Sequence, residues 1–171
     1  MSTTLTLPTT REDHRIAYLA ALAITIHIAE SALPVPLPGV KPGLANVVTV
    51  LVLLQFGWRA AAWVALLRVV VGSVLLGTFL SPTFLLSLSG ALAALAALGL
   101  GSRLPGLGPA GYCVLAALAH MAAQFWTAYA LFIPHPALLH LFPVFMTLAL
   151  VFGLVSGTIA ASTLRQLARS P

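Results

Sequence analysis

The sequence predicts an all-α integral membrane protein, a bundle of six transmembrane helices. Its 171 residues are 60% hydrophobic and only 6% charged, and the mean hydropathy is +1.06. A soluble domain carries about 25% charged residues, so most of this surface must face lipid. The apolar residues form continuous runs instead of alternating patterns. Such runs satisfy their own backbone in lipid only as helices, which excludes a β-barrel.

The apolar runs divide the chain into three parts. We expect a polar cytoplasmic tail (residues 1–15), a six-helix membrane domain (residues 16–164) and a cytoplasmic C-terminal tail (residues 165–171). The predicted spans are Ile16–Leu33, Leu44–Phe56, Ala60–Phe79, Phe84–Leu98, Ala110–Phe132 and Leu141–Leu164. The second and fourth runs are shorter than the ~20 residues that a perpendicular span needs. We expect those two helices to be short, broken or capped by a loop that dips into the protein.

The basic residues indicate the orientation. With the N-terminus inside, the outer loops hold only Lys41. The inner segments then hold Arg11, Arg15, Arg59, Arg103, Arg165 and Arg169. This asymmetry predicts that both termini are cytoplasmic in a multi-pass protein of the cell (inner) membrane. The net charge of +5 is scattered singly at segment ends and does not indicate nucleic-acid binding, which needs clustered basic residues.

A proline-rich connection between the first and second spans is the most informative stretch. Residues 30–46 contain four prolines, the only lysine (Lys41) and the only acid outside the N-terminal tail (Glu30), and they end at Asn46. Proline fixes φ and removes an amide donor, so this piece cannot continue a helix and must be a stiff loop. We interpret it as the rim of a small-molecule site, with the loop 34–42 covering an outward-facing pocket.

Arg68 lies near the middle of the third span. Arginine at that depth costs at least about 2.5–3.5 kcal/mol, so it should face the bundle interior and have a partner. Glu30 is the only acid in the spans and hence the only ionic partner available there. One interpretation is a structural ion pair or bonds to backbone carbonyls, and the other is an anion-binding group for a substrate.

Other polar side chains share helix faces. His120 and Gln124 lie one turn apart on the fifth span, where they could line a pocket or bond a neighbouring helix. Asn46 and Ser87 add uncharged hydrogen-bonding groups. The predicted substrate-binding residues are Glu30, Lys41, Asn46, Arg68, Ser87, His120 and Gln124.

The sequence lacks the residues that several kinds of catalysis and cofactor binding require. Asp13 is the only aspartate, so no Asp-rich motif can hold Mg²⁺ for diphosphate chemistry. There is no Walker A sequence, dinucleotide-binding turn or Cys/His cluster. We therefore expect no metal site, no cofactor and no catalysis by this chain.

Small residues recur at helix-packing spacing. Gly153 and Gly157 on the last span, and Ala17 and Ala21 on the first, lie four residues apart. Both stripes suit close packing within the bundle. The pair on the first helix is alternatively a docking stripe for another membrane protein.

Several blocks resemble one membrane family. These are Glu30 with Leu33-Pro34, then Pro42-Gly43-Leu44-Ala45-Asn46, Leu67-Arg68, Gly72-Ser73, Phe79-Leu80-Ser81-Pro82, Ser87-Leu88-Ser89-Gly90, and His120 with Gln124. They resemble the family known as heptaprenyl diphosphate synthase component I or Gx transporter. Met121 replaces an asparagine of the family pattern beside His120.

That family is similar to the S components of energy-coupling-factor (ECF) transporters. The resemblance implies six helices, an outward-facing pocket, and an Ala-x-x-x-Ala stripe (here Ala17 and Ala21) that docks a transmembrane coupling subunit driven by ATPases. It predicts a substrate-binding subunit for uptake of a vitamin-like or other small metabolite. The alternatives are an accessory membrane subunit of a heptaprenyl or polyprenyl diphosphate synthase, and a purely structural assembly subunit.

Overall fold

The computed structural model describes residues 10–32 and 44–169, and all of the regular structure in those ranges is helical. The helices are α1 (Arg11–Ala32), α2 (Leu44–Phe56), α3 (Trp58–Leu75), α4 (Pro82–Gly101), α5 (Pro109–Leu131), α6 (Pro136–Leu139) and α7 (Phe142–Leu167). The predicted all-α class is confirmed. Lys41 and the proline-rich loop lie outside the described residues.

Five helical segments are long and apolar enough to cross a membrane: α1, α3, α4, α5, and the stretch Pro136–Leu167 that joins α6 to α7. Helix α2 has 13 residues, about 20 Å at 1.5 Å per residue, against a hydrocarbon core of about 30 Å. The chain is therefore a multi-pass membrane protein. A sixth crossing by α2 and the side of each terminus stay predictions.

The expectation of a short fourth helix is wrong, because α4 runs for 20 residues. Its start is well defined: Pro82 is the first helical residue, and the Ser81 hydroxyl accepts a hydrogen bond from the Phe84 amide. The helix ends at Gly101, beyond the predicted end of the span at Leu98. A Cβ on Gly99 would lie 2.8 Å from Nε1 of Trp58, so this glycine permits close packing against that ring.

Helix α1 begins at Arg11, five residues before the predicted span. The Thr10 hydroxyl accepts a hydrogen bond from the Asp13 amide (3.2 Å), and the Thr10 amide donates to the Asp13 carboxylate (2.8 Å). This reciprocal pair is a capping box and fixes the first turn. Part of the polar segment before Ile16 is therefore helical.

Helix α3 ends at Leu75 and not at the predicted Phe79. Gly77 adopts a φ of +67° in the turn that follows.

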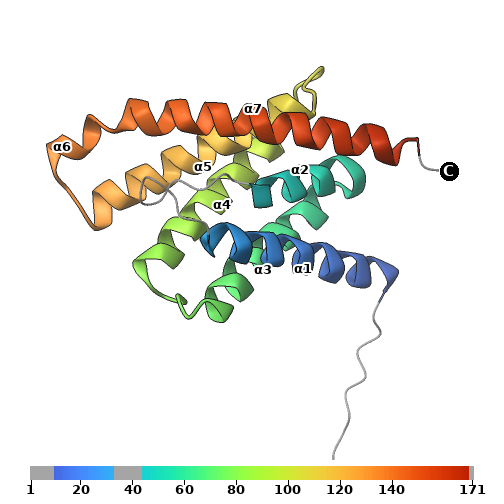
Figure 1. Cartoon of the computed structure of the whole chain (residues 1–171), viewed down its shortest axis with the longest axis horizontal. Helices are drawn as coiled ribbons and strands as arrows, with labels where there is room; N and C mark the ends of the chain where they lie inside the picture. The colour runs from blue at the N-terminus through green and yellow to red at the C-terminus, as the bar shows by residue number, and fades with distance from the viewer. Residues whose placement is uncertain (1–9, 33–43, 170–171) are drawn as a thin grey trace, which may run out of the picture.

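The helices form a bundle with α1 and α7 on opposite sides (Figure 1). Helix α7 packs along α5, α5 along α4, and α1 along α3. The short α2 contacts α1, α3, α5 and α7, and its valines Val47, Val48, Val50 and Val52 are buried. Helix α2 thus occupies the interior of one half of the bundle.

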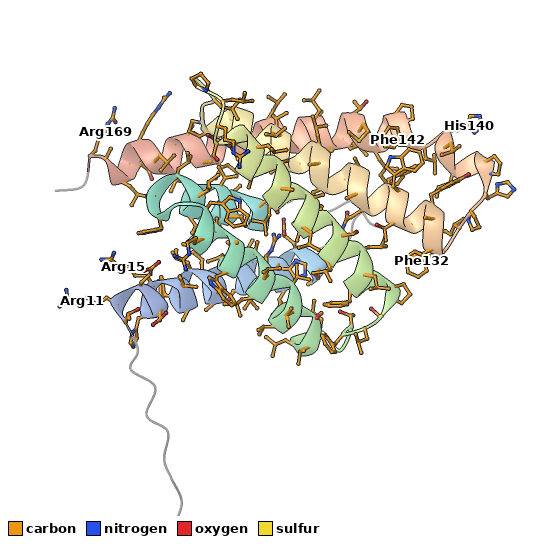
Figure 2. All side chains as sticks on the ribbon, turned by 180° about the vertical axis from the view of Figure 1, so that it is seen from behind. Arg11, Arg15, Phe132, His140, Phe142 and Arg169 are labelled. Atoms are coloured by element: carbon orange, nitrogen blue, oxygen red, sulfur yellow. The ribbon has the colours of Figure 1, made fainter. Side chains whose placement is uncertain are left out.

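The two ends of the bundle differ in charge. Figure 2 shows Arg11, Arg15 and Arg169 at one end, and Phe132, His140 and Phe142 at the other. The start of α1 and the end of α7 therefore lie at the same end of the bundle. The outer surface between the ends exposes large apolar side chains, among them Trp63, Val74 and Leu154. This surface suits contact with lipid.

The two small-residue stripes have different surroundings. A Cβ on Gly153 would lie 2.9 Å from Cα of Val114, and one on Gly157 would lie 2.6 Å from Cα of Ala110. That stripe therefore packs α7 against α5. Ala17 and Ala21, in contrast, are exposed, and their role in docking a partner stays a prediction.

We predict that Gly157→Leu destabilises the bundle by about 1–3 kcal/mol, since the new side chain meets backbone that cannot move aside. Thermal unfolding of the detergent-solubilised protein measures this. Gly108→Ser is the control, because a Cβ at Gly108 meets nothing within 4 Å. Equal unfolding temperatures for the two variants would contradict close packing of α7 on α5.

Candidate functional site

A cavity of about 290 Å³ lies inside the bundle. Residues of every helix from α1 to α7 line it. The lining includes every predicted substrate-binding residue that the structure describes, namely Glu30, Asn46, Arg68, Ser87, His120 and Gln124. Residues far apart in the sequence thus share one chamber, and substrate binding by them stays a prediction. Lys41 lies outside the described residues.

A buried polar cluster forms where α1, α2 and α3 meet. Arg68 is 5% exposed and Glu30 is 4% exposed. The terminal Nη2 of Arg68 donates to Oδ1 of Asn46 at 3.1 Å, and the Glu30 carboxylate interacts electrostatically with the same guanidinium. Among the described residues, no acceptor serves the Nε of Arg68. Glu30 therefore acts as the ionic partner of Arg68.

Local structure explains how these three side chains meet. Glu30 lies in the last turn of α1, Asn46 in the first turn of α2, and Arg68 in the middle of α3. The chain leaves α1 and returns as α2, so Glu30 and Asn46 lie near the same end of the bundle. The long arginine side chain joins them from α3. A buried charge is tolerable in this setting only with such partners.

Glycines bring the neighbouring helices close to the cavity. A Cβ on Gly90 of α4 would lie 2.7 Å from Cε1 of His120 and 2.9 Å from Cγ of Gln124. A Cβ on Gly72 of α3 would lie 3.2 Å from Cδ2 of His27. A larger residue at Gly90 would collide with His120 and Gln124, and one at Gly72 would crowd His27. The two glycines therefore allow these side chains to pack closely against α4 and α3. The predicted substrate-binding residues did not include Gly72, Gly90 or His27, although His27 lies one turn before Glu30.

Part of the cavity lining, on α7 and α5, is largely apolar and was not predicted. Phe145, Ala149, Phe152 and Ser156 of α7 line it at a spacing that keeps them on one helix face. Phe125 of α5 packs nearby, with its ring centroid 6.2 Å from that of Phe145. The regular spacing on α7 was the available signal, but any buried helix face shows the same pattern.

A second, smaller space of about 250 Å³ adjoins the first. The two share His27, Val69, Thr83 and Ser87 in their linings. Hydroxyl groups dominate the polar part of the second space, contributed by Ser31, Ser73, Thr78, Thr83 and Ser87. The main cavity therefore continues toward the turn between α3 and α4.

Metal ligands do not gather in the described part of the chain, where no group of three or more His, Cys, Asp or Glu residues is close enough to hold an ion. His135 caps α6, and its Nδ1 accepts a hydrogen bond from the Ala137 amide at 3.2 Å. The arrangement suits recognition of an organic molecule through hydrogen bonds on one side and apolar contact on the other.

The fold and cavity define a multi-pass helical membrane protein with an internal amphipathic chamber. The family model for heptaprenyl diphosphate synthase component I matches residues 19–163, and the chain belongs to that family. The predicted family membership is confirmed, whereas similarity to ECF S components stays a prediction. Comparison with curated proteins and with solved structures gives no significant match.

We predict strong energetic coupling between Arg68 and Glu30. Either Arg68→Met or Glu30→Gln alone removes one partner of the buried pair and should cost about 3–5 kcal/mol. The double variant leaves no unpaired charge and should recover much of that loss. Thermal unfolding of all four proteins gives the coupling energy. Strictly additive losses would mean that the two side chains do not stabilise each other.

Proposed function

We propose that this protein is the membrane-embedded substrate-binding subunit of an uptake system for a vitamin-like or other small metabolite, similar in role to the S component of an ECF transporter. The observation that carries the proposal is the convergence of Glu30, Asn46, Arg68, His120 and other polar groups on one cavity. In a chain with 6% charged residues, placing so many polar groups there calls for a polar occupant.

The site binds and does not catalyse in this proposal. Its outward-facing pocket is covered by the proline-rich loop 34–42, and a separate ATPase module drives release inward. The exposed Ala17 and Ala21 on α1 are the proposed docking stripe for a transmembrane coupling subunit, because small exposed residues allow close helix approach in lipid. The membrane is the bacterial inner membrane, and no cofactor takes part.

Ligand retention tests this function. Protein purified from membranes should carry a small molecule that mass spectrometry identifies after denaturation. Gln124→Leu should lower the retained amount about tenfold, because it removes hydrogen-bonding groups from the cavity. Gln55→Leu is the matched control, since Gln55 is exposed near the end of α2. A wild-type protein that is reproducibly empty, and takes up nothing from cell extract, would overturn the proposal.

A second candidate is an accessory membrane subunit of a heptaprenyl or polyprenyl diphosphate synthase. The family description favours it. The apolar cavity wall formed by Phe125, Phe145 and Phe152 would suit part of an isoprenoid chain.

This second function predicts synthase activity that depends on the present chain. A catalytic synthase subunit mixed with it in detergent or vesicles should make product faster, or of different chain length, than the catalytic subunit alone. Unchanged rate and product length would exclude the accessory role. The Gly157→Leu variant controls for a nonspecific effect of added membrane protein.

A further inference from the structure

The main cavity runs along α5 and α7 from an exposed end to a buried end. Thr83, at the start of α4, and Ile133, just after α5, line the cavity and are exposed. Cys113 and Ser156 also line it, but they are only 2% and 4% exposed. The cavity therefore has a deep end between α5 and α7, far from its exposed lining residues.

Contacts between α5 and α7 show which residues share a level. Gly157 packs against Ala110, so its neighbour Ser156 lies beside the first turns of α5, where Cys113 also lies. Gln124 lines the cavity nearer its exposed end. Along the axis of α5, Gln124 is about 16 Å from Cys113 at 1.5 Å per residue. The cavity therefore extends about this far along the helix.

Apolar side chains line the stretch between these two levels. Helix α5 contributes Ala117 and Met121 there, and α7 contributes Ala149 and Phe152. A cavity of about 290 Å³ that extends over this length is long and narrow. It therefore suits a chain-like molecule better than a bulky, compact one.

The hydroxyl of Ser156 is the polar group at the deep end. On the same helix, the exposed Thr147 and Thr158 each donate to a carbonyl oxygen of the preceding turn, at 2.9 and 2.7 Å. Helical hydroxyls are commonly satisfied in this way. Within residues 10–32 and 44–169, the hydroxyl of the buried Ser156 makes no hydrogen bond. A buried hydroxyl without a partner is costly, so this one calls for a partner in the cavity.

The Ser156 oxygen opens into the cavity. Among the described residues, it is not one of the side-chain atoms that are both sealed from their surroundings and without a partner, so it keeps accessible surface. The residue is otherwise buried, and the cavity is the space that it lines. A molecule that reaches the deep end therefore meets a hydroxyl that can donate and accept.

The other level of the cavity also carries hydrogen-bonding groups. The side chains of Ser87 and Gln124 line it there, and neither makes a hydrogen bond within the part of the chain that the structure describes. Both can donate and accept. The cavity thus presents polar groups at two levels about 16 Å apart, with apolar lining between them.

We propose that the cavity binds an elongated molecule with a hydrogen-bonding group at each end and an apolar chain between them, and that Ser156 is the specificity residue for the group at the deep end. This inference rests on the proposed function and names the ligand class of the same site. A molecule with one polar head and a plain hydrocarbon tail, such as a prenyl diphosphate, would leave the Ser156 hydroxyl against hydrocarbon. The cavity therefore disfavours such molecules.

Two probes that differ in one group test the proposal. Octane-1,8-diol and nonan-1-ol have the same number of non-hydrogen atoms, and nonanol has a methyl group in place of the second hydroxyl. With a hydrogen bond of about 2.8 Å at each end, the cavity leaves about 10 Å for the molecule, which an extended octanediol fills. Dissociation constants for the full-length protein in lipid nanodiscs follow from the dependence of its unfolding temperature on probe concentration.

The ratio of the nonanol to the octanediol dissociation constant is compared between wild type and Ser156→Ala, which cancels the unequal partition of the probes into lipid. The variant should lower this ratio about fivefold to tenfold, because the diol loses a hydrogen bond that nonanol does not make in addition to its first. Thr158→Ala is the matched control. It removes an exposed hydroxyl that already donates to Val155, so the ratio should not change.

A measurement on the wild type alone covers the case in which Ser156→Ala does not fold. Butane-1,4-diol is too short to reach both levels of the cavity. The ratio of the pentan-1-ol to the butanediol dissociation constant should therefore be at least about fivefold smaller than the ratio for the longer pair.

Three results would overturn the inference. They are equal ratios in wild type and Ser156→Ala, equal ratios for the short and the long pair in the wild type, and no binding of octanediol. The first two would mean that water alone serves the Ser156 hydroxyl. The proposed function fails separately. A protein that purifies empty and takes up nothing from cell extract would overturn uptake, whereas the probe ratios would still decide the role of Ser156.

Discussion

The structure depends on one buried polar cluster, in which Arg68 donates to Asn46 and interacts electrostatically with Glu30. In a chain that offers lipid an apolar surface, a single arginine at membrane depth must be satisfied from within. Asn46 accepts from its terminal nitrogen at 3.1 Å, and Glu30 supplies the opposite charge. Because these partners come from the end of α1 and the start of α2, the requirement joins three helices at one level. The cavity lies beside that junction.

The distances between the helices also shape the cavity. Gly153 and Gly157 hold α7 against α5, and Gly90 lets α4 approach His120 and Gln124. The outcome is asymmetric: α1 to α4 supply most of the polar lining, and α7 supplies an apolar face with Phe145 and Phe152. The helices therefore contribute either polar or apolar lining, according to the side chains that each one turns toward the cavity.

Much of this fold can be predicted from hydropathy and charge, because a membrane span needs a long apolar run and its ends are marked by charged residues. Segment positions were predictable, as was the need of Arg68 for Glu30, since no other acid was available in the spans. Helix ends were less predictable: the Thr10–Asp13 capping box starts α1 early, and α4 continues to Gly101, with Gly99 packed against Trp58. The aromatic wall could not be predicted, because Phe145 and Phe152 have the same spacing as any packed face. Which stripe faces a cavity depends on tertiary packing.

Family membership and cavity chemistry bear on function in different ways. The family description names a synthase component, whereas the amphipathic chamber supports reversible binding of a small molecule. The most direct measurement is an electron cryomicroscopy or crystal structure of the protein with the molecule that it retains from the cell. Our interpretation requires ligand density inside the chamber, in contact with Arg68 and with the phenylalanines opposite. Density bound elsewhere on the helices, with the chamber holding water alone, would contradict it.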